Sequence, residues 1–422
     1  MRTVLRTSWS PMKSVIKIML GISAYCLLVS FSGNSPMREE ALRRAAIQAG
    51  VVPLEEIQIE TDPDLVEIGA VLFESELLSF NGDTSCSTCH LDEFASADGL
   101  PNAVGTGGHG EGLKRLESGG DVVPRNTLAL WGRGSKGFDT LFWDGKIKRT
   151  DNGIISQFGS SVPSNDDPLF VAVHLPFVEI REMVVRDSGV REDLEKEDVD
   201  SAAEIYSVLT QRIQEDIELG PAIAAANEVS VEALEFKHIA ASVAAFIRER
   251  FSVRRTRFHD FVFNGGELSA EELEGGLIFY GKGRCSSCHT GSLLSDLKFH
   301  AMPFLQAGFG KNGFGVDYGR FNVTYDTTDL YKFRTPPLIS VAKTGPWTHS
   351  GSMSSLQNVI VAHLDPLSAY DGSGRSARQR REDLARLARW IDTEALPEPL
   401  SGQEIESVVS FLETLNAGPA DP

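Results

Sequence analysis

Hydrophobic residues recur at helical spacing in several separate stretches of the chain. This periodicity predicts helices over residues 37–50, 65–73, 199–219, 231–251, 273–279, 353–364, 376–393 and 401–415. Segments with strand-like alternation are few and short. Residues 100–125 and 305–335 are rich in glycine and show little periodicity, which is typical of loops. We therefore expect a mainly α fold with long irregular loops.

Four of the five cysteines belong to two motifs of one form, Cys86-Ser-Thr-Cys89-His90 and Cys285-Ser-Ser-Cys288-His289. The C-x-x-C-H form is the attachment signature of c-type haem. Its two thiols add to the porphyrin vinyl groups, and the histidine becomes the proximal iron ligand. Two redox-active C-x-x-C centres or a Cys/His zinc site are the alternatives, and neither explains a histidine directly after both pairs. The sequence therefore predicts two covalently bound haem c groups.

The two motifs lie in a weak internal repeat. Gly69-Ala-Val-Leu72-Phe73 precedes the first motif, and Gly275-Gly-Leu-Ile278-Phe279 precedes the second. A glycine-containing loop follows each, so two related haem domains explain the repeat. We assign residues 33–60 to an N-terminal linker and helix, 61–252 to the first haem domain and 253–397 to the second. The helix at 401–415 is expected to complete the first domain.

The N-terminus has the layout of a secretory signal peptide, which we assign to residues 1–32. Basic residues come first, an apolar run covers residues 18–31, and small residues follow. The apolar run is short for a membrane span, so an uncleaved membrane anchor is the weaker alternative. Export suits covalent haem attachment, and we expect a periplasmic protein.

The formal net charge of −19 affects which classes of partner the protein is expected to bind. An acidic surface disfavours nucleic acid and favours a basic protein partner, although solubility alone explains the charge equally well. The chain contains neither a G-x-S-x-G nucleophile elbow nor a GxxxxGK[ST] phosphate loop. The sequence therefore gives no support to a hydrolase or a nucleotide-binding protein of those classes.

Several motifs follow one another in an order that resembles the bacterial dihaem cytochrome c peroxidases and their MauG-like relatives. Besides the two C-x-x-C-H motifs, they are Arg125-Asn126-Thr127, Phe142-Trp143-Asp144-Gly145, Phe333-Arg-Thr-Pro336, Thr344-Gly-Pro346-Trp-Thr-His349-Ser-Gly351 and Leu356-Gln-Asn-Val-Ile-Val-Ala-His363. The likeness covers roughly residues 60–415. It implies two cytochrome c-like haem domains packed against each other. It further implies that peroxide reacts at the His90 haem, while the His289 haem receives and relays electrons.

The resemblance also implies roles between the haems. Trp143 matches a tryptophan that relays electrons, and a core aromatic residue is the alternative for it. One Ca²⁺ ion is expected at the domain interface, held by Asn126, Thr344 and Pro346. All three positions offer oxygen donors, as a hard cation requires.

The sixth ligand of the second haem is Met in the peroxidases and Tyr in the MauG enzyme. Counting seven residues from Leu356 places His363 at this position, so the resemblance implies a bis-histidine haem of His289 and His363. Met302 and Met353 are competing candidates, and a histidine on the helix surface is the alternative. Because Met/His ligation raises a haem potential, imidazole weakens the inference of a high-potential cytochrome c as donor.

At the peroxide-reacting haem, the family's acid–base glutamate matches Glu182, with Glu179 as the neighbour most easily confused with it. Peroxide cleavage needs such a group, since one oxygen loses a proton and the leaving oxygen gains one. The family's nearby glutamine falls on Ala172, which is a departure. His174 is a candidate for the missing polar group, and a structural histidine is the alternative.

His109 resembles the loop histidine that caps the resting first haem in peroxidases, and an ordinary loop residue is the alternative. The leading interpretation is a periplasmic peroxidase that takes electrons from cytochrome c or a cupredoxin and reduces hydrogen peroxide. A MauG-like oxidase of a protein substrate and a non-enzymatic dihaem electron carrier are the alternatives. The resemblance also suggests a homodimer.

Overall fold

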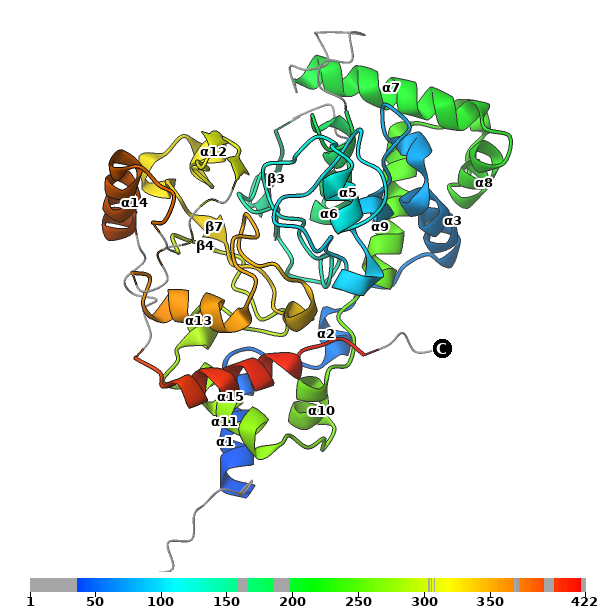
Figure 1. Ribbon diagram of the computed structural model, residues 1–422. Helices are drawn as coiled ribbons and strands as arrows, with labels where there is room; N and C mark the ends of the chain where they lie inside the picture. Colours follow the sequence, from blue (N-terminus) through cyan, green and yellow to red (C-terminus); the bar gives the residue numbers. More distant parts are fainter. Residues whose placement is uncertain are drawn as a thin grey trace, which may run out of the picture. The chain divides into compact units, whose positions relative to one another are not determined.

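The chain builds the same crossing of two helices twice (Figure 1). In the computed structural model, α3 (Pro63–Glu74) packs against α9 (Phe236–Arg250), and α11 (Ala270–Tyr280) packs against α15 (Gly402–Glu413). Helix α3 precedes the first C-x-x-C-H motif, and α11 precedes the second. The internal repeat in the sequence therefore corresponds to a repeated packing unit.

A glycine allows each pair of helices to approach closely. A Cβ atom at Gly69 would lie 2.0 Å from the carbonyl oxygen of Ser242, and one at Gly275 would lie 1.8 Å from that of Ser407. A side chain does not fit at either position without moving the partner helix. One turn further along, an aromatic pair packs in the same way in both crossings: Phe73 with Phe246 at 5.0 Å between ring centroids, and Phe279 with Phe411 at 5.2 Å.

The structure describes residues 36–157, 165–184, 198–302, 304, 306, 308–367, 370, 372–390 and 398–418. The further α-helices are α1 (Pro36–Gln48), α2 (Leu54–Ile57), α4 (Cys86–Cys89), α5 (Leu113–Glu117), α6 (Pro168–Val173), α7 (Val199–Glu215), α8 (Leu219–Ala226), α10 (Arg257–Phe263), α12 (Phe321–Thr324), α13 (Leu356–Leu364) and α14 (Ala377–Trp390). The strands are β1 (Thr140–Leu141), β2 (Ile147–Thr150), β3 (Gly153–Ile155), β4 (Phe299–His300), β5 (Phe309–Gly310), β6 (Gly313–Phe314) and β7 (Phe333–Arg334). They form three small antiparallel sheets, β1-β2-β3, β4-β7 and β5-β6.

The mainly α fold is confirmed, and every helix predicted from periodicity is present with ends shifted by a few residues. Capping residues set several of the starts: Ser269 and Glu272 form a capping box at α11, and Ser401 and Glu404 form one at α15. Helices α6, α8 and α10 were not predicted. They have only six to eight residues, too few for a helical period to stand out.

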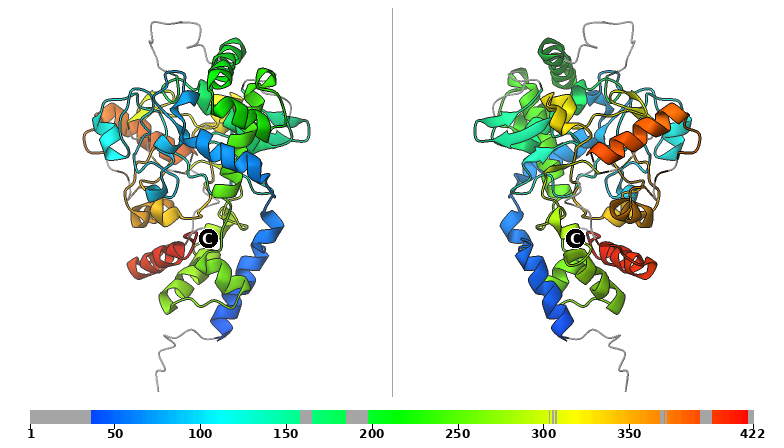
Figure 2. Two further views of the ribbon diagram at one scale, coloured as in Figure 1. Left: turned by 90° about the vertical axis from the view of Figure 1, so that its right-hand side faces the viewer. Right: turned by 90° about the vertical axis from the view of Figure 1, so that its left-hand side faces the viewer.

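The packing of two helices near the ends of the described chain differs from the expected domain composition. Helix α15 packs on α11 and α13 of the second half, so it does not complete the first haem domain. Helix α1, part of the expected N-terminal linker and helix, packs on α10 and α11 of the second half (Figure 2). Its Leu42 lies against Gly276 of α11. The amphipathic pattern of α15 predicted a buried face, but it carried no information about which half would bury it.

Residues 34–422 form one compact unit, and the division into haem domains at residue 252 stays a prediction. The proposed signal peptide, residues 1–32, lies outside the described residues. Among the described helices, none combines the length and the apolar character needed to cross a bilayer.

Candidate haem sites and the wall between them

The first C-x-x-C-H motif forms one short helical turn, α4, at the side of a cavity. Cys86, Cys89 and His90 line this cavity. The Nδ1 atom of His90 lies 2.8 Å from the carbonyl oxygen of Ser96, which fixes the ring and leaves Nε2 as the metal-binding nitrogen. Burial lowers the pKa of His90 to about 4, so the imidazole is neutral, as a metal ligand must be.

The second motif repeats this arrangement at another cavity, lined by Cys285, Cys288 and His289. The Nδ1 atom of His289 lies 3.0 Å from the carbonyl oxygen of Leu294. Burial, followed by the charge of His363, lowers the pKa of His289 to about 4. Both proximal imidazoles therefore have the same backbone support and the same protonation state.

The thiols lie in surroundings that disfavour the thiolate form. Burial raises the pKa values of Cys86 and Cys285 to about 12, and it also raises that of Cys89. A zinc site or a redox dithiol needs a thiolate, whereas the thioether to haem is uncharged. The residues present therefore fit haem better than either alternative.

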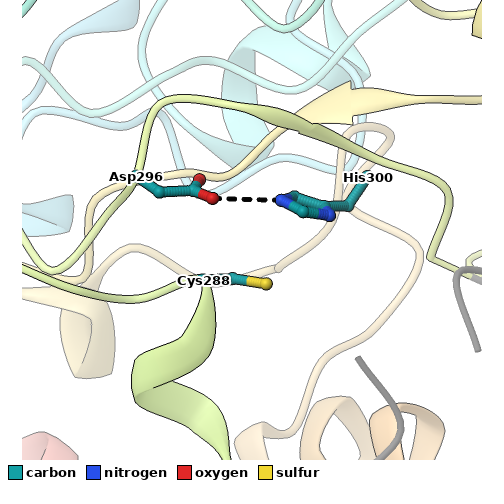
Figure 3. A group of neighbouring side chains, drawn as sticks. All are labelled: Cys288, Asp296 and His300. Carbon is teal, nitrogen blue, oxygen red and sulfur yellow. Dashed lines mark hydrogen bonds and ion pairs between the residues drawn. The ribbon is translucent and has the colours of Figure 1, made fainter. Parts of the chain in front are cut away.

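Cys288, Asp296 and His300 form a group that could hold a metal ion (Figure 3). The Nε2 atom of His300 lies 3.1 Å from a carboxylate oxygen of Asp296. This group shares Cys288 with the haem motif, and a thioether sulfur is a much weaker zinc ligand than a thiolate. We therefore regard the Asp296–His300 pair as part of the surroundings of the second haem.

The second cavity is also lined by His363, which comes from α13 and is half-buried. Its Nδ1 atom lies 2.7 Å from the carbonyl oxygen of Val359, so Nε2 is again the nitrogen available for a metal. Met302 lines the same cavity, whereas Met353 does not. The structure thus brings His363 and His289 to one cavity, and axial ligation by His363 stays a prediction.

Trp143 belongs to the wall that the two cavities share. The shared lining residues are Asn126, Thr127, Leu128, Arg133 and Trp143. The Trp143 indole is buried, and its Nε1 donates a hydrogen bond of 3.0 Å to the carbonyl oxygen of Asn126. The indole is therefore held rigidly between the two cavities, where the sequence interpretation places a relay.

Oxygen atoms converge on the Asn126 side chain at this wall. Its amide Nδ2 lies 2.6 Å from the carbonyl oxygen of Pro346 and 3.3 Å from that of Thr348. Thr344 lines the second cavity nearby, and its hydroxyl donates to the carbonyl oxygen of Val341. Rotation of the Asn126 amide by half a turn would present Oδ1 beside the Pro346 oxygen, which suits a hard cation.

The first cavity contains two carboxylates, and they have different surroundings. Glu179 forms an ion pair with Lys146. Burial alone would raise the pKa of Glu179, but the charges of Lys146 and Lys311 hold it below its ordinary value. Glu182 lines the same cavity, and after burial its charge is a further cause of the raised thiol pKa values of the first motif. The charge of Glu182 thus acts on both thiols of the first motif, and at Cys89 the charge of Asp98 has the larger effect.

The segment that carries Glu182 is clamped by backbone contacts. The Thr106 amide donates to the carbonyl oxygen of Arg181, at 3.1 Å, and the Phe80 amide donates to that of Met183, at 2.9 Å. A Cβ at Gly105 would lie 1.9 Å from the Arg181 carbonyl oxygen, so glycine is required there. Arg181 itself has a left-handed φ of 75°, a strained conformation that such a clamp can maintain.

The other two histidine candidates do not reach the first cavity. His174 is buried among Phe170, Tyr206 and Phe236, and no hydrogen-bond partner reaches its Nε2. It is a core histidine, so it does not replace the family's distal glutamine, and Ala172 lines the cavity at that position. His109 is exposed in its glycine-rich loop and is not among the residues that line the cavity, which favours the ordinary loop interpretation.

Buried arginines are the site residues that sequence reasoning missed. Arg125 forms ion pairs with Asp144, at 2.6 Å, and with Asp317, at 2.8 Å. Because Asp317 belongs to the second half, this pair connects the lining of the first cavity to the second half. Arg133 and Arg334 are buried as well, and both line the second cavity. Arg125 and Arg334 stand in motifs of the resemblance, but nothing in the sequence reveals their partners.

Comparison with known proteins agrees with this geometry. The family model described as di-haem cytochrome c peroxidase matches residues 63–267. The chain is 23% identical to the cytochrome-c peroxidase IdrP1 of Pseudomonas sp. strain SCT, over 94% of this chain and 92% of that protein. It is 26% identical to the methylamine utilization protein MauG of Methylorubrum extorquens, over 85% of this chain and 80% of that protein.

Two solved structures have a similar fold. One is a MauG-like protein associated with microbial copper homeostasis, with a TM-score of 0.62 and 22% identity over 87% of this chain and 93% of that one. The other is the diheme peroxidase BthA from Burkholderia thailandensis, with a TM-score of 0.61 and 19% identity over 87% of this chain and 89% of that one. Residues 63–267 thus match the di-haem cytochrome c peroxidase family, and the chain as a whole is similar to proteins named cytochrome c peroxidase and MauG.

Proposed function

We propose that this protein is a periplasmic peroxidase that reduces hydrogen peroxide at the His90 site with electrons relayed through the His289 site. The observation that carries the proposal is an asymmetry between two otherwise similar cavities. The first contains a carboxylate pair, Glu179 and Glu182, while no carboxylate lines the second among the described residues. A carboxylate that can exchange protons with peroxide is thus available at the first site, and relatives named cytochrome c peroxidase support a peroxidase.

Haem bound at His90 would supply the iron at which the O–O bond of peroxide is cleaved. Reduction to two water molecules consumes two electrons and two protons. Glu182 would accept a proton from one peroxide oxygen and return it to the other, which leaves as water. Glu179, paired with Lys146, stays charged and balances that cation. Trp143 lies in the wall through which electrons from the second site pass.

A MauG-like oxidation of a protein substrate is the second candidate, and His363 is the observation that favours it. A histidine in place of methionine lowers the potential of the second haem and makes it a poorer acceptor for high-potential donors. An enzyme of this type would take its electrons from aromatic side chains of a partner protein. The acidic chain suits a basic partner in either case, and a homodimer remains part of the proposal.

Peroxide addition followed by low-temperature electron paramagnetic resonance tests the enzyme proposal. We expect the ferric protein, matured with both haems, to give one high-spin and one low-spin signal, because His109 does not reach the first cavity. Both signals should diminish when one equivalent of peroxide is added. Two low-spin signals that are indifferent to peroxide, even after half-reduction, would instead identify an electron carrier.

The same wall supports a proposal of one Ca²⁺ ion held by Asn126 and by the carbonyl oxygens of Thr344 and Pro346. Removal of the ion with a chelator is expected to slow electron transfer between the haems, because the ion would join residues from both halves. Re-addition of Ca²⁺, but not of Mg²⁺, should restore the rate, since Mg²⁺ demands a tighter octahedral geometry. Elemental analysis checks the stoichiometry, and a protein without calcium that relays electrons at full rate would contradict the assignment.

A further inference from the structure

The charged groups in the second cavity all have the same sign. The chain as a whole carries a formal charge of −19, yet neither aspartate nor glutamate lines this cavity within the described part of the chain. Its charged or titratable lining residues, apart from the two thiols and Arg334 itself, are Arg133, Arg284, His289, His300, His349 and His363. An apolar cavity lined by three arginines is suited to bind an anion.

Arg334 is the most deeply buried of these cations, with 1% of its surface exposed. Its Nε donates to the carbonyl oxygen of Phe142, at 2.9 Å, and its Nη1 donates to that of Thr335, at 3.2 Å. Its Nη2 has no hydrogen-bond partner and no water-accessible surface. A buried guanidinium with an unmet donor is costly unless an anion completes its hydrogen bonds.

Arg133 adds a second positive charge at the same wall. It is 6% exposed, its Nε donates to the Ala129 carbonyl oxygen at 2.8 Å, and no carboxylate of the described residues forms an ion pair with it. The guanidinium carbons of Arg133 and Arg334 lie 5.8 and 5.4 Å from the centroid of the Phe138 ring. Burial lowers the pKa values of both arginines, and the charge of Arg133 lowers that of Arg334 further. Two cations in contact with one ring repel each other unless a negative group lies between or beside them.

We propose that Arg334, supported by Arg133 of the wall shared by the two cavities, binds a propionate carboxylate of the second haem. This inference rests on the proposed attachment of haem at His289, and it adds the residues that neutralise the porphyrin. Haem carries two propionates, and the covalent bonds to Cys285 and Cys288 constrain where they lie. Because Nη2 is enclosed by protein, a rotation of the Arg334 side chain toward the cavity would bring this unmet donor to the carboxylate, and the planar guanidinium suits such a pair.

The pair has a consequence for the reduction potential. A guanidinium beside the propionate disfavours the more positive ferric state, so its removal lowers the potential of the His289 haem. Removal also leaves a buried carboxylate without a counter-charge, which raises the pKa of that carboxylate into the neutral range. The potential of the variant then falls as the pH rises, because deprotonation of the propionate stabilises the ferric state. In the wild type, the carboxylate stays ionised and this dependence is absent.

The test is a spectroelectrochemical titration of the intact dihaem protein carrying Arg334→Gln, between pH 5.5 and 8.5. Mass spectrometry first confirms two attached haems. At pH 8 we expect at least a threefold decrease in the equilibrium constant for reduction of the His289 haem, which corresponds to roughly 28 mV for one electron. We also expect a new pH dependence relative to the wild type. Arg257→Gln is the matched control, because Arg257 pairs with Glu272 in the same half and does not line the cavity.

A pH dependence identical to that of the wild type would overturn the proposal, even if the potential itself moved, because a distant charge effect would then suffice. If the glutamine variant does not attach both haems, Arg334→Lys is measured in its place, because lysine retains the positive charge. The propionate-bending band in the resonance Raman spectrum of Arg334→Lys should shift relative to the wild type, while that of Arg257→Lys should not. An unshifted band in Arg334→Lys would likewise exclude the contact. Neither readout uses peroxide, so failure of the peroxidase proposal would be seen separately.

Discussion

Replacement of Glu182 by glutamine is expected to slow peroxide reduction by about 10²- to 10⁴-fold, the usual contribution of a positioned acid–base group. Both haem spectra should stay unchanged, because Glu182 is not a metal ligand. The amide has a similar shape but cannot exchange a proton with the peroxide oxygens. Stopped-flow measurement of the first step after mixing with peroxide, at saturating and limiting concentrations, checks the prediction.

Glu179→Gln separates Glu182 from its neighbour. Glu179 is engaged with Lys146, and its pKa lies below the ordinary value, so it is poorly suited to accept and return a proton. We expect this variant to lose far less activity than Glu182→Gln. The reverse order of effects would transfer the acid–base role to Glu179, and normal kinetics of Glu182→Gln would remove Glu182 from the mechanism.

Replacement of His363 by alanine is expected to abolish the low-spin signal of the second haem and to produce a high-spin signal in its place. The reason is the loss of His363, the histidine of α13 that lines the same cavity as His289. Methionine at the same position should instead keep six-coordination and raise the potential, as Met/His ligation does. Electron paramagnetic resonance and redox titration distinguish the two variants.

An unchanged low-spin signal in His363→Ala would refute the assignment and point to Met302, which lines the same cavity. Met302→Leu is therefore the matched variant. It should leave the wild-type spectrum intact if His363 is the ligand, and it should convert the haem to high-spin if Met302 is.

The residues predicted most securely from the sequence are those whose chemistry depends on local spacing. The two C-x-x-C-H motifs lie at separate cavities, and the backbone supports of His90 and His289 match. His363, which the family resemblance placed at the second haem, lines the second cavity, and its ligation stays a prediction. In these cases the relevant geometry extends over a few residues, so the sequence alone contains it.

Properties that depend on distant packing were not predictable. Arg334 takes its significance from a cavity that no carboxylate of the described residues lines, and this results from the arrangement of many segments. The packing of α15 on α11 was likewise not predictable from the sequence, because an amphipathic pattern shows that a helix has a buried face but not which helix covers it. His174 looked like a polar group for the cavity, but three aromatic side chains surround it instead.

The packing of α1 and α15 on the same helix has a consequence for the order of folding that would apply under the proposed export to the periplasm. The second half is discontinuous in sequence: α1 comes from before the first half, and α10, α11, α13 and α15 come from after it. The first half is in effect an insertion into the second. In a chain translocated from its N-terminus, the α3–α9 crossing can close early, whereas the α11–α15 crossing must wait for nearly the last residues. We therefore expect the His289 motif to stay accessible to the haem-attachment machinery until translocation ends, after the first half has already closed.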